Sequence, residues 1–514
     1  MFASIRSSCL VGLDAVSIDV EVNLRNGQPR FSIIGLGGAA VRESKERIIA
    51  ALEYCGFDPP GQILVNLAPA ELRKESSVFD LPIAIAILVA MGVVPAERTK
   101  RAVFCGELSL TGEVKRLTGA VAHGLHALRG GVKEIFVPQE DAVETAVVPE
   151  IEVVPVISLA QTLRILGGKE EPSKVTPAEI EQRRGVRSLH DVVGQQTSKE
   201  ALIVAAAGGH NMLMIGPPGC GKSMIAERLS GILPPLSSRE MLEVVQIHSV
   251  AGQDTASVLQ GVRPFRAPHH VISEPGLIGG GSGPRPGEIS LAHRGVLFLD
   301  EFPEFRRGTL EALRSPLECG KVQLARARAS VHFPARFQLI AAMNPCPCGR
   351  LGGSSGVCRC SHYAVRDYLA RLSQPILDRI DLQVELDGIN VEDLAYSERI
   401  TGKDDADVRK KIEIARQIQI DRFGCLNSEV PDLQMREKSE QTSSARTLLA
   451  DATRKLGVSA RGYMRLLRVA RTIADLSGSA TVSDEAVAQA LGYRCLERLH
   501  NLINGGSSLR TASH

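Results

Sequence analysis

The sequence predicts an α/β protein whose central part is a doubly wound parallel sheet, followed by a mostly helical part. Between Leu189 and Leu386, strand-like and helix-like segments alternate with glycine-rich connections, which is the pattern of a doubly wound sheet. One of these connections is a glycine-rich motif between an apolar strand and a helix. Residues 403–500 carry few strand signals and are predicted to be helical.

Length and composition are those of a globular protein with several domains. The 514 residues are too many for one core, so about three domains are expected. The apolar fraction of 44% and the charged fraction of 23% are ordinary for globular proteins. The net charge is only +2 and Trp is absent, so a nucleic-acid partner would need a local basic patch and would find little base stacking.

The first 165 residues alternate strand and helix signals. Residues 15–24, 61–69 and 101–110 are predicted strands, and residues 39–57 form an amphipathic helical pattern. The apolar run 81–94 is shorter than the about 20 residues of a membrane span, so a buried helix is expected. The first residues make a poor signal peptide, and seven of the eleven cysteines are scattered singly. A cytoplasmic protein with reduced thiols and no membrane partner is therefore expected.

The segment GPPGCGKS fits the G-x-x-x-x-G-K-[ST] motif, with the strand NMLMI before it and the helix SMIAERLSGIL after it. Its glycines let backbone N–H groups face phosphate oxygens, and the helix N-terminus adds a positive dipole end. Lys222 is expected to contact the β- and γ-phosphates of ATP, and Ser223 to bind Mg²⁺. The predicted phosphate-binding residues are Gly216, Pro217, Pro218, Gly219, Cys220, Gly221, Lys222, Ser223 and Met224.

Later apolar strands end in side chains that suit phosphoryl transfer. GVLFLDE ends in Asp300, expected to hold Mg²⁺ through water, and Glu301, expected to orient or deprotonate the attacking water. FQLIAAMN ends in Asn344, which could reach the γ-phosphate or the water. Arg379 stands between acidic residues in QPILDRIDLQVEL, and the residues alone leave a structural ion pair and a catalytic role equally open.

Shifts in composition divide the chain into domains. Residues 1–166 form a first domain, and the polar, charged and Pro-containing residues 167–187 form a linker. The nucleotide-binding domain is expected over residues 188–390 and a helical lid domain over residues 391–504. The last residues, 505–514, are expected to be a disordered tail.

Long segments of the chain resemble the AAA+ ATPases of the magnesium-chelatase-like group, and most closely the ComM/YifB family. The resemblance extends along nearly the whole chain. In the N-terminal part it is carried by FSIIGLGGAAVRESKERI, ILVNLAPAELRKE and FDLPIAIAIL. Further on it is carried by AAAGGHNMLMIGPPGCGKSM, FRAPHH, PGEISLAHRGVLFLDE, AAMNPCPCG, ILDRIDLQVEL and VSARGYMRLLRVARTIADL.

This resemblance implies further roles for single residues. Asn344 falls at the sensor-1 position, and Arg379 falls at the arginine finger, which acts on the nucleotide of a neighbouring subunit. Arg461 falls at sensor 2 in the helical lid. Such motors form rings, typically hexamers, so a homo-oligomeric ring is implied.

The first domain resembles the proteolytic domain of Lon, which uses a Ser–Lys pair. Aligning the matching segments puts Val78 at the serine position and Val121 at the lysine position, while Ser76 and Ser77 are out of register. A hydroxyl without a base is a poor nucleophile. We therefore expect a non-proteolytic module for substrate or subunit contact.

Four cysteines stand close together just after Asn344, as the pairs Cys346-x-Cys348 and Cys358-x-Cys360. Four thiolates suit tetrahedral Zn²⁺, and a disulfide is not expected in the cytosol. The Cys-x-Cys spacing is less specific than Cys-x-x-Cys. Free thiols and a redox switch therefore stay open as alternatives, with His362 as a substitute ligand.

Two segments are candidates for contact with a substrate. Residues 263–293 resemble the helix-2 insert of the chelatase and replicative-helicase branch, and their glycines predict a mobile segment outside the packed core. Its paired histidines, His269 and His270, are more often surface or hydrogen-bonding groups than metal ligands. Residues 321–337 are predicted to form a hairpin with arginines for phosphates, although an ordinary solvated hairpin remains open.

The expected function is that of an ATP-hydrolysing AAA+ ring motor. The resemblance implies a DNA helicase that migrates branches in homologous recombination and natural transformation, with branched or single-stranded DNA as partner. The alternative is a chelatase-type ATPase that remodels a partner protein without DNA. The expected cofactors are ATP and Mg²⁺, with Zn²⁺ in the cysteine loop.

Overall fold

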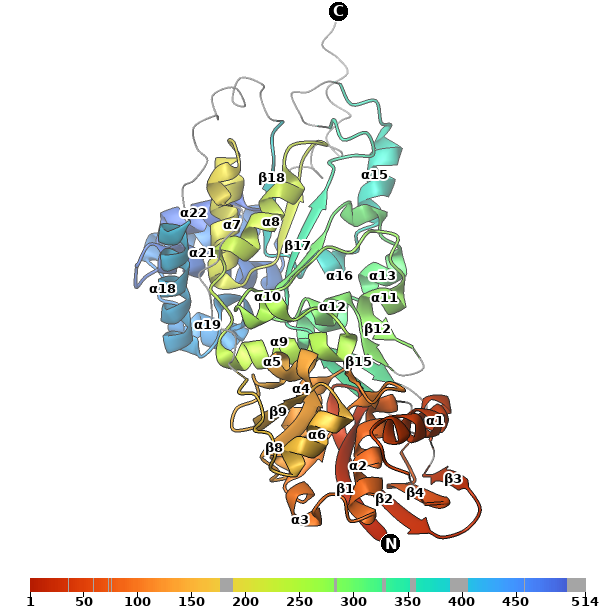
Figure 1. Cartoon of the computed structure of the whole chain (residues 1–514). Helices are drawn as coiled ribbons and strands as arrows, with labels where there is room; N and C mark the ends of the chain where they lie inside the picture. Colours follow the sequence, from red (N-terminus) through yellow and green to blue (C-terminus); the bar gives the residue numbers. More distant parts are fainter. Residues whose placement is uncertain are drawn as a thin grey trace, which may run out of the picture.

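The computed structural model describes residues 1–35, 37–58, 60–72, 74, 76–175, 188–281, 284–325, 330–351, 357–388, 405–456 and 458–496. The predicted tail 505–514, most of the predicted linker 167–187, and Arg326 and Arg328 of the hairpin lie outside these residues. Figure 1 shows the N-terminal part at one end of the molecule, the central sheet beyond it and the C-terminal helices beside that sheet.

The N-terminal part is built on two sheets. One has the order β1-β2-β4-β3, and the other is a parallel sheet of order β5-β8-β9. The predicted strand 101–110 is divided at Cys105 and Gly106 into β5 and β6. The strands are β1 (Phe2–Val11), β2 (Asp14–Arg25), β3 (Arg30–Ile34), β4 (Gln62–Ala68), β5 (Ala102–Phe104), β6 (Glu107–Leu108), β7 (Val114–Lys115), β8 (Glu134–Pro138) and β9 (Glu152–Val156).

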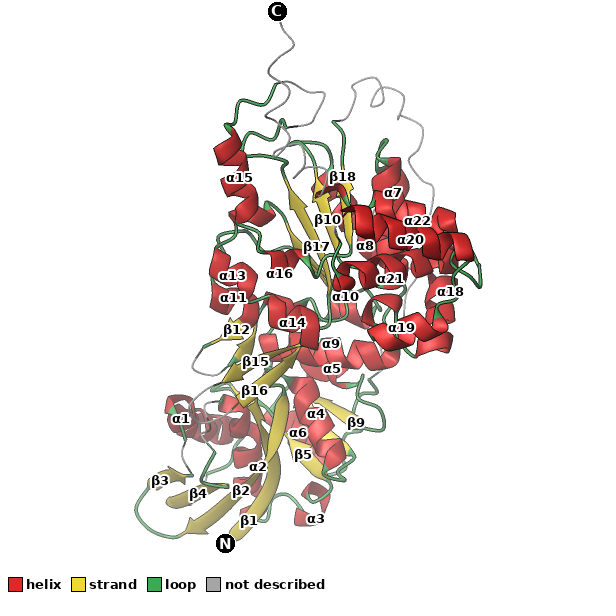
Figure 2. Cartoon of the chain, turned by 180° about the vertical axis from the view of Figure 1, so that it is seen from behind, coloured by secondary structure: helices red, strands yellow, loops and turns green. Residues whose placement is uncertain are grey.

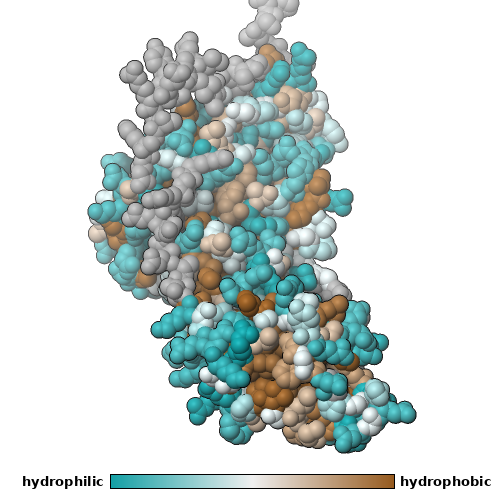
Figure 3. All heavy atoms as spheres, in the orientation of Figure 1, coloured by the Kyte–Doolittle hydropathy of each residue, from teal (hydrophilic) through white to brown (hydrophobic). Residues whose placement is uncertain are grey.

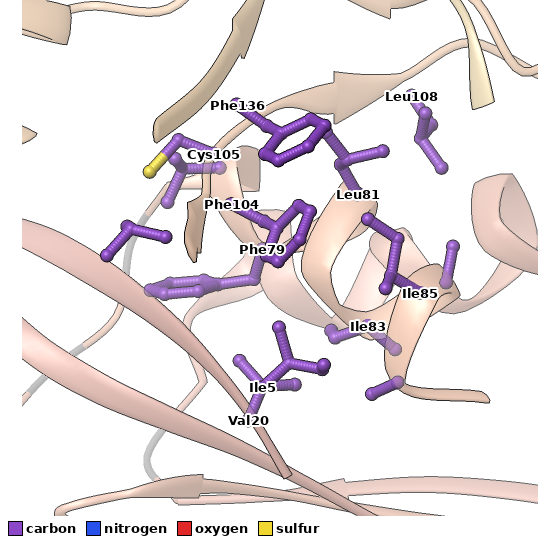
Figure 4. Packing of buried hydrophobic residues seen from close by; sticks show 14 of the residues in the cluster. Ile5, Val20, Phe79, Leu81, Ile83, Ile85, Phe104, Cys105, Leu108 and Phe136 are labelled. Atoms are coloured by element: carbon purple, nitrogen blue, oxygen red, sulfur yellow. The ribbon is translucent and has the colours of Figure 1, made fainter. Parts of the chain in front are cut away.

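The apolar run of the N-terminal part forms a helix that is buried all round, as expected. In α2 every residue except Val89 is buried, and its neighbours come from both sheets (Figure 4). Phe104 and Phe136 stack with their ring centroids 4.6 Å apart. The helices are α1 (Ala39–Tyr54), α2 (Asp80–Ala90), α3 (Ala96–Thr99), α4 (Ala120–Arg129), α5 (Ala142–Thr145) and α6 (Leu159–Leu166), with 3-10 turns η1 (Ser77–Phe79) and η2 (Gln139–Asp141).

The central part contains the predicted parallel sheet. Its five strands have the order β11-β14-β17-β10-β18, and every neighbouring pair is parallel. In chain order within this sheet that is 2-3-4-1-5, so β10 lies between the fourth and fifth strands. The strands are β10 (Met212–Ile215), β11 (Phe265–Arg266), β14 (Val296–Leu299), β17 (Gln338–Met343) and β18 (Leu382–Glu385).

Helices cover both faces of this sheet, which confirms the predicted fold class. Separate buried clusters contain alternate residues of β10, β14 and β17, as strands buried on both faces require. The helices are α7 (Gln196–Gly208), α8 (Lys222–Ile232), α9 (Ser238–Ala251), α10 (Ala256–Leu259), α11 (Glu274–Ile278), α12 (Glu288–Leu291), α13 (Arg307–Glu311), α14 (Arg314–Cys319), α15 (His362–Ala370) and α16 (Gln374–Leu377), with 3-10 turns η3 (Leu189–Asp191) and η4 (Phe302–Glu304).

Two short hairpins accompany the sheet: β12 (Gly279–Gly280) with β13 (Arg285–Pro286), and β15 (Lys321–Ala325) with β16 (Ser330–Pro334). The second is the predicted hairpin, and it lies beside the N-terminal sheet (Figure 2). A Cβ on Gly12, in the turn between β1 and β2, would be 2.7 Å from a methyl of Val331. The described part of this hairpin therefore packs against the N-terminal part.

The insert 263–293 corrects one expectation, because it is a packed element. Leu277 and Ile289 are fully buried in the core on one face of the sheet, and Leu291 is nearly so. A Cβ on Gly287 would be 2.3 Å from the nitrogen of Gly279, so the glycines allow two backbones to meet closely. The glycines of the insert thus allow close packing of its backbone, whereas their number in the sequence predicted mobility.

The C-terminal part is helical, as predicted, and it packs against α7. Nε and Nη2 of Arg416 donate to the carbonyl of Ala206 at 2.9 and 2.6 Å. The Nε2 atom of His210 lies 2.8 Å from Oγ1 of Thr472. Its helices are α18 (Ala406–Phe423), α19 (Asp432–Lys438), α20 (Ser443–Leu456), α21 (Ala460–Leu476) and α22 (Asp484–Gly492), with the 3-10 turn η5 (Asn427–Glu429).

The N-terminal part is joined to the central part through α9, which lies next to α4 and α5 in both views (Figures 1 and 2). The buried carboxylate of Glu144 accepts hydrogen bonds from Ser249 Oγ at 2.7 Å and Thr255 Oγ1 at 3.0 Å. The buried apolar residues of this contact are Val121, Val148, Leu236, Val244, Val245, Val258 and Leu259. Local sequence patterns gave no sign of this contact.

The face of the molecule in Figure 3 is mostly hydrophilic over the central part, and hydrophobic residues gather on the N-terminal part. In the described ranges, no helix has both the length and the apolar character that crossing a membrane requires.

Candidate nucleotide-binding site

The predicted phosphate-binding residues form the turn between β10 and α8 and the first residues of α8. Gly219 and Gly221 have φ angles of 78° and 92°, a region that glycine enters without strain. A Cβ on Gly216 would be 2.7 Å from the carbonyl oxygen of Leu386, so only glycine fits there. Cys220 is buried beneath the turn. The backbone can thus turn its N–H groups towards an anion at the N-terminus of α8.

Lys222 reaches back across this turn. Its Nζ atom donates to the carbonyls of Gly216 and Pro217 at 2.7 and 2.9 Å, and to Oδ1 of Asn344 at 3.1 Å. Burial lowers the pKa of Lys222 from its ordinary value. A triphosphate would exchange these neutral acceptors for charged phosphate oxygens, which make stronger bonds with an ammonium group.

Asn344 lies beside the turn because β17 is the neighbour of β10. Ile215 and Met343 are paired in the sheet, and the N–H of Gly216 donates to the carbonyl of Met343 at 3.2 Å. The residues that follow the two strands must therefore be neighbours. The side chain of Asn344 therefore lies beside the ammonium group of Lys222.

Ser223 and Asp300 form the second contact across the site. Ser223 Oγ donates to Oδ2 of Asp300 at 2.7 Å. Asp300 comes directly after β14, and its Oδ1 accepts the N–H of Glu301 at 2.8 Å. A hydroxyl and a carboxylate are the hard oxygen ligands that Mg²⁺ prefers, so these residues fit a Mg²⁺ ion bound together with phosphates.

Glu301 is at the same edge of the sheet as Asp300, but its side chain has a different neighbour. Its φ angle is 51°, in the left-handed region that non-glycine residues rarely adopt. Its Oε2 is 3.0 Å from Nδ1 of His270. The sequence predicted a place for Glu301 but not this neighbour, whose only signal was the pair of histidines in the insert.

The four cysteines come together next to the phosphate-binding turn. Their sulfur atoms all lie within 4.8 Å of one another, and Cys346 Sγ is 3.4 Å from Cys348 Sγ and 3.6 Å from Cys358 Sγ. Backbone N–H groups, that of Arg359 foremost, lower the pKa of Cys348 to about 6. His362, the predicted substitute, begins α15 and is not part of this group.

The cysteine loop touches the phosphate-binding turn directly. A Cβ on Gly349 would be 2.5 Å from Cδ of Pro218 and 3.8 Å from Cγ of Asn344. The backbone of Gly349 therefore packs directly against the ring of Pro218. Its φ angle is 75°, in the left-handed region. The cysteine loop is therefore in contact with Pro218 of the turn and lies close to Asn344.

Arg379 is at the opposite edge of the sheet from Lys222. It precedes β18, and its carbonyl accepts the side-chain amide of Asn211, which precedes β10, at 2.8 Å. The length of β10, about 13 Å at roughly 3.3 Å per residue, separates this edge from the phosphate-binding turn. The guanidinium of Arg379 pairs with Glu318. Arg379 thus cannot reach the nucleotide of its own chain.

A cleft of about 910 Å³ opens at this edge, between the sheet and the C-terminal helices. It lies far from Lys222 and Asp300, neither of which lines it. The arginines that line it are Arg263, Arg294, Arg336, Arg379, Arg416, Arg465 and Arg468.

Arg461 lies in the first turn of α21 and is exposed. Arg465 follows one turn later on the same helix face, and it donates to the carbonyls of Leu377 and Ile380 at 3.1 Å. Leu377 and Ile380 belong to the segment that contains Arg379. Arg461 therefore lies on the helix face that is turned to this segment. The structure therefore does not bring Arg461 to Lys222 of the same chain.

The positions that match the Lon Ser–Lys pair hold no nucleophile. Val78 is buried in the core of the N-terminal part, and Val121 is fully buried against α9 in another cluster. Ser8 Oγ and His123 Nδ1 are 2.6 Å apart nearby, but both side chains are buried, and burial lowers the pKa of His123 to about 4. This pair is a structural contact without access to a peptide.

The sheet order and the polar residues along its carboxyl edge define an AAA+ ATPase of the P-loop class. Comparison with known proteins agrees: the family profile "Magnesium chelatase, subunit ChlI" matches residues 188–394. The chain belongs to the ComM/YifB family of magnesium-chelatase-like ATPases.

Other profiles and single relatives support this assignment. "Subunit ChlI of Mg-chelatase" matches residues 20–141, and "Magnesium chelatase, subunit ChlI C-terminal" matches residues 402–494. The chain is 40% identical over 503 residues to the competence protein ComM of Haemophilus influenzae, covering 97% of this chain and 98% of that protein. It is 38% identical over 496 residues to the uncharacterized protein YifB of Escherichia coli K12, covering 96% and 97%.

A partial match concerns the N-terminal part. The Lon protease of Rhizobium meliloti is 29% identical over 162 residues, which cover 28% of this chain and 20% of that protein. The Lon-like character of the N-terminal part is therefore supported, while Val78 and Val121 stand where the resemblance would put the catalytic pair.

Proposed function

We propose that this protein is an ATP-driven ring motor that acts on DNA, most specifically as a branch-migration helicase in homologous recombination. The observation that carries the ATPase part is the bonding of Lys222 to Asn344 and of Ser223 to Asp300. These contacts join three strand ends and one helix start into a single site for a Mg²⁺-bound triphosphate.

The proposed reaction is transfer of the γ-phosphoryl group of ATP to water. The water oxygen attacks the γ-phosphorus, the carboxylate of Glu301 accepts the water's proton, and the bond to the β,γ-bridging oxygen breaks to give ADP and phosphate. Lys222 stabilises the charge on the phosphate oxygens. Mg²⁺, held by Ser223 and Asp300, would supply additional neutralisation of the phosphate charge.

A ring is proposed because Arg379 lies at the edge of the sheet opposite to the phosphate-binding turn of its own chain. In a closed ring, the edge of one subunit that carries Arg379 would meet the edge of the next subunit that carries Lys222. A guanidinium supplied in this way stabilises the charge of the transition state. The cleft lined by seven arginines is on the same edge and would add positive potential there.

The DNA part is supported by the family and by two surface elements. The relative in Haemophilus influenzae is named a competence protein, and competence is the uptake of DNA. The insert exposes Val271 and residues 273–276, and the β15–β16 hairpin exposes Lys321 and His332. A chelatase-type motor acting on a protein is the second candidate, favoured by the chelatase profiles that match the chain.

ATPase measurements separate the two candidates. For a DNA motor, a four-way junction or single-stranded DNA should stimulate ATP hydrolysis several-fold, and the stimulation should weaken as salt rises because phosphate contacts release counterions. A protein-remodelling ATPase would hydrolyse ATP at the same rate with and without DNA. That result would exclude the helicase.

We also propose that the four cysteines hold a structural Zn²⁺ ion. Zinc bound by thiolates at about 2.3 Å in a tetrahedron requires sulfur atoms about 3.8 Å apart. The sulfur separations of 3.4, 3.6 and 3.7 Å are close to this value and far from the roughly 2.05 Å of a disulfide. Zinc would fix the loop that carries Gly349 against the phosphate-binding turn.

A further inference from the structure

Arg379 stands on a short piece of chain that has little support of its own. It lies between α16, which has only four residues, and β18. A single helical turn is not stable by itself, because its few hydrogen bonds do not offset the cost of ordering the backbone. The position of Arg379 therefore depends on the contacts that other elements make with residues 377–381.

Arg465 of the C-terminal part makes three of these contacts. Its Nη1 atom donates to the carbonyls of Leu377 and Ile380, each at 3.1 Å, and its Nη2 atom donates to Oδ1 of Asp378 at 3.1 Å. Only 10% of the Arg465 side chain is exposed. One guanidinium group on α21 thus holds the residues on both sides of Arg379.

Asn211 holds the same segment from the side of the sheet. Its side-chain amide donates to the carbonyl of Arg379 at 2.8 Å, and its Oδ1 atom accepts the N–H of Leu339 in β17 at 2.8 Å. Asn211 therefore attaches the backbone of Arg379 to the sheet, whereas Arg465 attaches it to the C-terminal helices. The segment is fixed only where both attachments are made.

The contacts of Arg465 depend on the shape of its side chain. Burial lowers the pKa of Arg465, and two carbonyls and the Asp378 carboxylate replace the water that the guanidinium has lost. A guanidinium presents its donors in a rigid planar fork, whereas the ammonium of a lysine is a point charge that cannot reach all three acceptors. The position of α21 thus determines the conformation of residues 377–380.

We propose that Arg465 is a positioning residue that places Arg379 for the nucleotide of the neighbouring subunit. This inference rests on the proposed function, because it takes Arg379 as a group that acts across the ring. Without Arg465, residues 377–380 lose three hydrogen bonds and Arg379 loses its fixed position. The phosphate-binding turn of the same chain lies at the other edge of the sheet and stays intact. The C-terminal part thereby serves hydrolysis in the next subunit.

The first test compares two arginines of α21. Arg465→Gln should lower kcat for ATP about tenfold to a hundredfold, the cost of misplacing a group that acts on the transition state, and leave ATP binding unchanged. Arg468 is the matched control, because its side chain is 16% exposed and donates to Val430 and Asp432, which belong to the C-terminal part. Arg468→Gln should lower the melting temperature and keep kcat close to that of the parent. Equal losses of kcat in both variants would overturn the proposal.

Mixed rings separate an effect on the neighbour from damage to the variant's own site. Arg465→Gln mixed with Lys222→Ala should regain about a quarter of the parental turnover, because one chain supplies an intact phosphate-binding turn and the other a correctly placed Arg379. Mixed with Arg379→Ala it should gain nothing, because both chains then lack such an arginine. The reverse pattern would show that Arg465 supports the nucleotide site of its own chain, and would overturn the proposal.

Two further variants test whether Arg465 acts through Arg379. Arg379→Ala combined with Arg465→Gln should hydrolyse ATP no more slowly than Arg379→Ala alone, because the second change then has nothing left to position. A further loss would overturn the proposal. Arg465→Lys keeps the charge and loses the fork, so its kcat should be clearly below that of the parent. A parental kcat in Arg465→Lys would also overturn it, even if Arg465→Gln did not fold.

The mixtures also distinguish this inference from the proposed function. If Arg379→Ala and Lys222→Ala failed to restore each other's turnover in mixed rings, Arg379 would not act across the ring, and both would be wrong. If that pair restored turnover while Arg465→Gln with Lys222→Ala did not, the ring would stand and the role of Arg465 alone would be overturned.

Discussion

Lys222 and Glu301 serve one site from two directions, and their substitution should have separable effects. Lys222 approaches the phosphates from the start of α8, whereas Glu301 stands after β14 and is 55% exposed. One residue binds the triphosphate in every state, and the other is needed only when water attacks. Binding and hydrolysis can therefore be lost independently.

We predict that Lys222→Ala weakens ATP binding about tenfold or more, since a charge-assisted hydrogen bond contributes roughly 1.5–3 kcal/mol. Glu301→Gln should bind ATP like the parent and hydrolyse it about 10²- to 10⁴-fold more slowly, as loss of a general base implies. Equilibrium binding of ATP and single-turnover hydrolysis measure the two effects. If Glu301→Gln hydrolysed ATP at the parent's rate, the role given to Glu301 would be wrong.

Single residues of the site were predictable where a strand end fixes them. Gly216, Asp300 and Asn344 each follow an apolar strand, and parallel strands bring such residues to one edge whatever their separation in sequence. The contact of His270 with Glu301 was not predictable, because it depends on β11 lying beside β14, and a two-residue strand gives no pattern to detect. Arg461 was assigned by resemblance alone, and its contacts depend on how α21 packs.

At the scale of elements, the cysteine loop connects the four-cysteine cluster, where we propose Zn²⁺, to the candidate nucleotide-binding site. The loop follows β17 directly, and its Gly349 lies on Pro218. If the cysteine loop lost its fixed conformation, Pro218 and Asn344 would both lose the packing of Gly349 beside them. Folding of the loop and affinity for ATP should therefore change in parallel.

We predict one Zn²⁺ per chain in the purified protein, measured by atomic emission. Cys348→Ser should lose the ion, lower the melting temperature and raise KM for ATP. The exposed Cys319 on α14 provides a matched control, and Cys319→Ser should change none of these. A parent without zinc, together with a Cys348→Ser variant of parental stability and turnover, would leave the cysteines as ordinary thiols.

The contact of α4 with α9 explains why the N-terminal part carries no Lon-type lysine. Val121 is fully buried in one apolar cluster with Val244 and Val245, so an ammonium group there would be removed from water. We predict that Val121→Lys destabilises the protein by about 3–5 kcal/mol, the cost of an uncompensated buried charge, and confers no peptidase activity. Denaturant unfolding measures the first effect and a casein digest the second.

Val143→Lys is the control for this substitution. Val143 lies on the neighbouring helix α5 and is 40% exposed, so its lysine can reach water. Its stability should stay within about 0.5 kcal/mol of the parent. Equal destabilisation by both lysines would mean that the α4–α9 contact is not the cause.

Elements were predicted best where they have a strong period or a long apolar run. α2, β10, β14 and β17 have such runs, and they are where the sequence put them. The insert was wrongly expected to stay outside the core, because six glycines suggested mobility, whereas Gly279 and Gly287 allow close packing. Contacts between parts, such as Glu144 with Ser249, depend on surfaces far apart in sequence and leave no local signal.

For the whole molecule, the decisive feature is that Arg379 and the phosphate-binding turn lie at opposite edges of the same sheet. Lys222 and Asp300 are at the carboxyl edge of the sheet, and Arg379 is at the amino edge with the arginine-lined cleft. No motion within one chain that keeps the sheet intact can join these edges. The structure therefore requires a neighbour wherever Arg379 takes part in hydrolysis.

We predict that Arg379→Ala and Lys222→Ala are each nearly inactive, and that mixing them restores turnover. An arginine finger contributes about 10³- to 10⁵-fold to turnover. In a randomly assembled closed ring of equal parts, roughly a quarter of the interfaces would pair an intact Lys222 with an intact Arg379. Mixed rings, assembled after dissociation and assayed for ATP hydrolysis, should recover about that fraction.

Arg239 on α9 supplies the control for this mixture, because its side chain is 91% exposed and lies 3.7 Å from Glu243 of the same helix. Arg239→Ala should hydrolyse ATP like the parent, alone or mixed. If the mixture of Arg379→Ala and Lys222→Ala stayed inactive although mixed rings had formed, Arg379 would not act across the interface. Its pairing with Glu318 would then be its whole role, and the nucleotide site would be completed by some other residue of the neighbour.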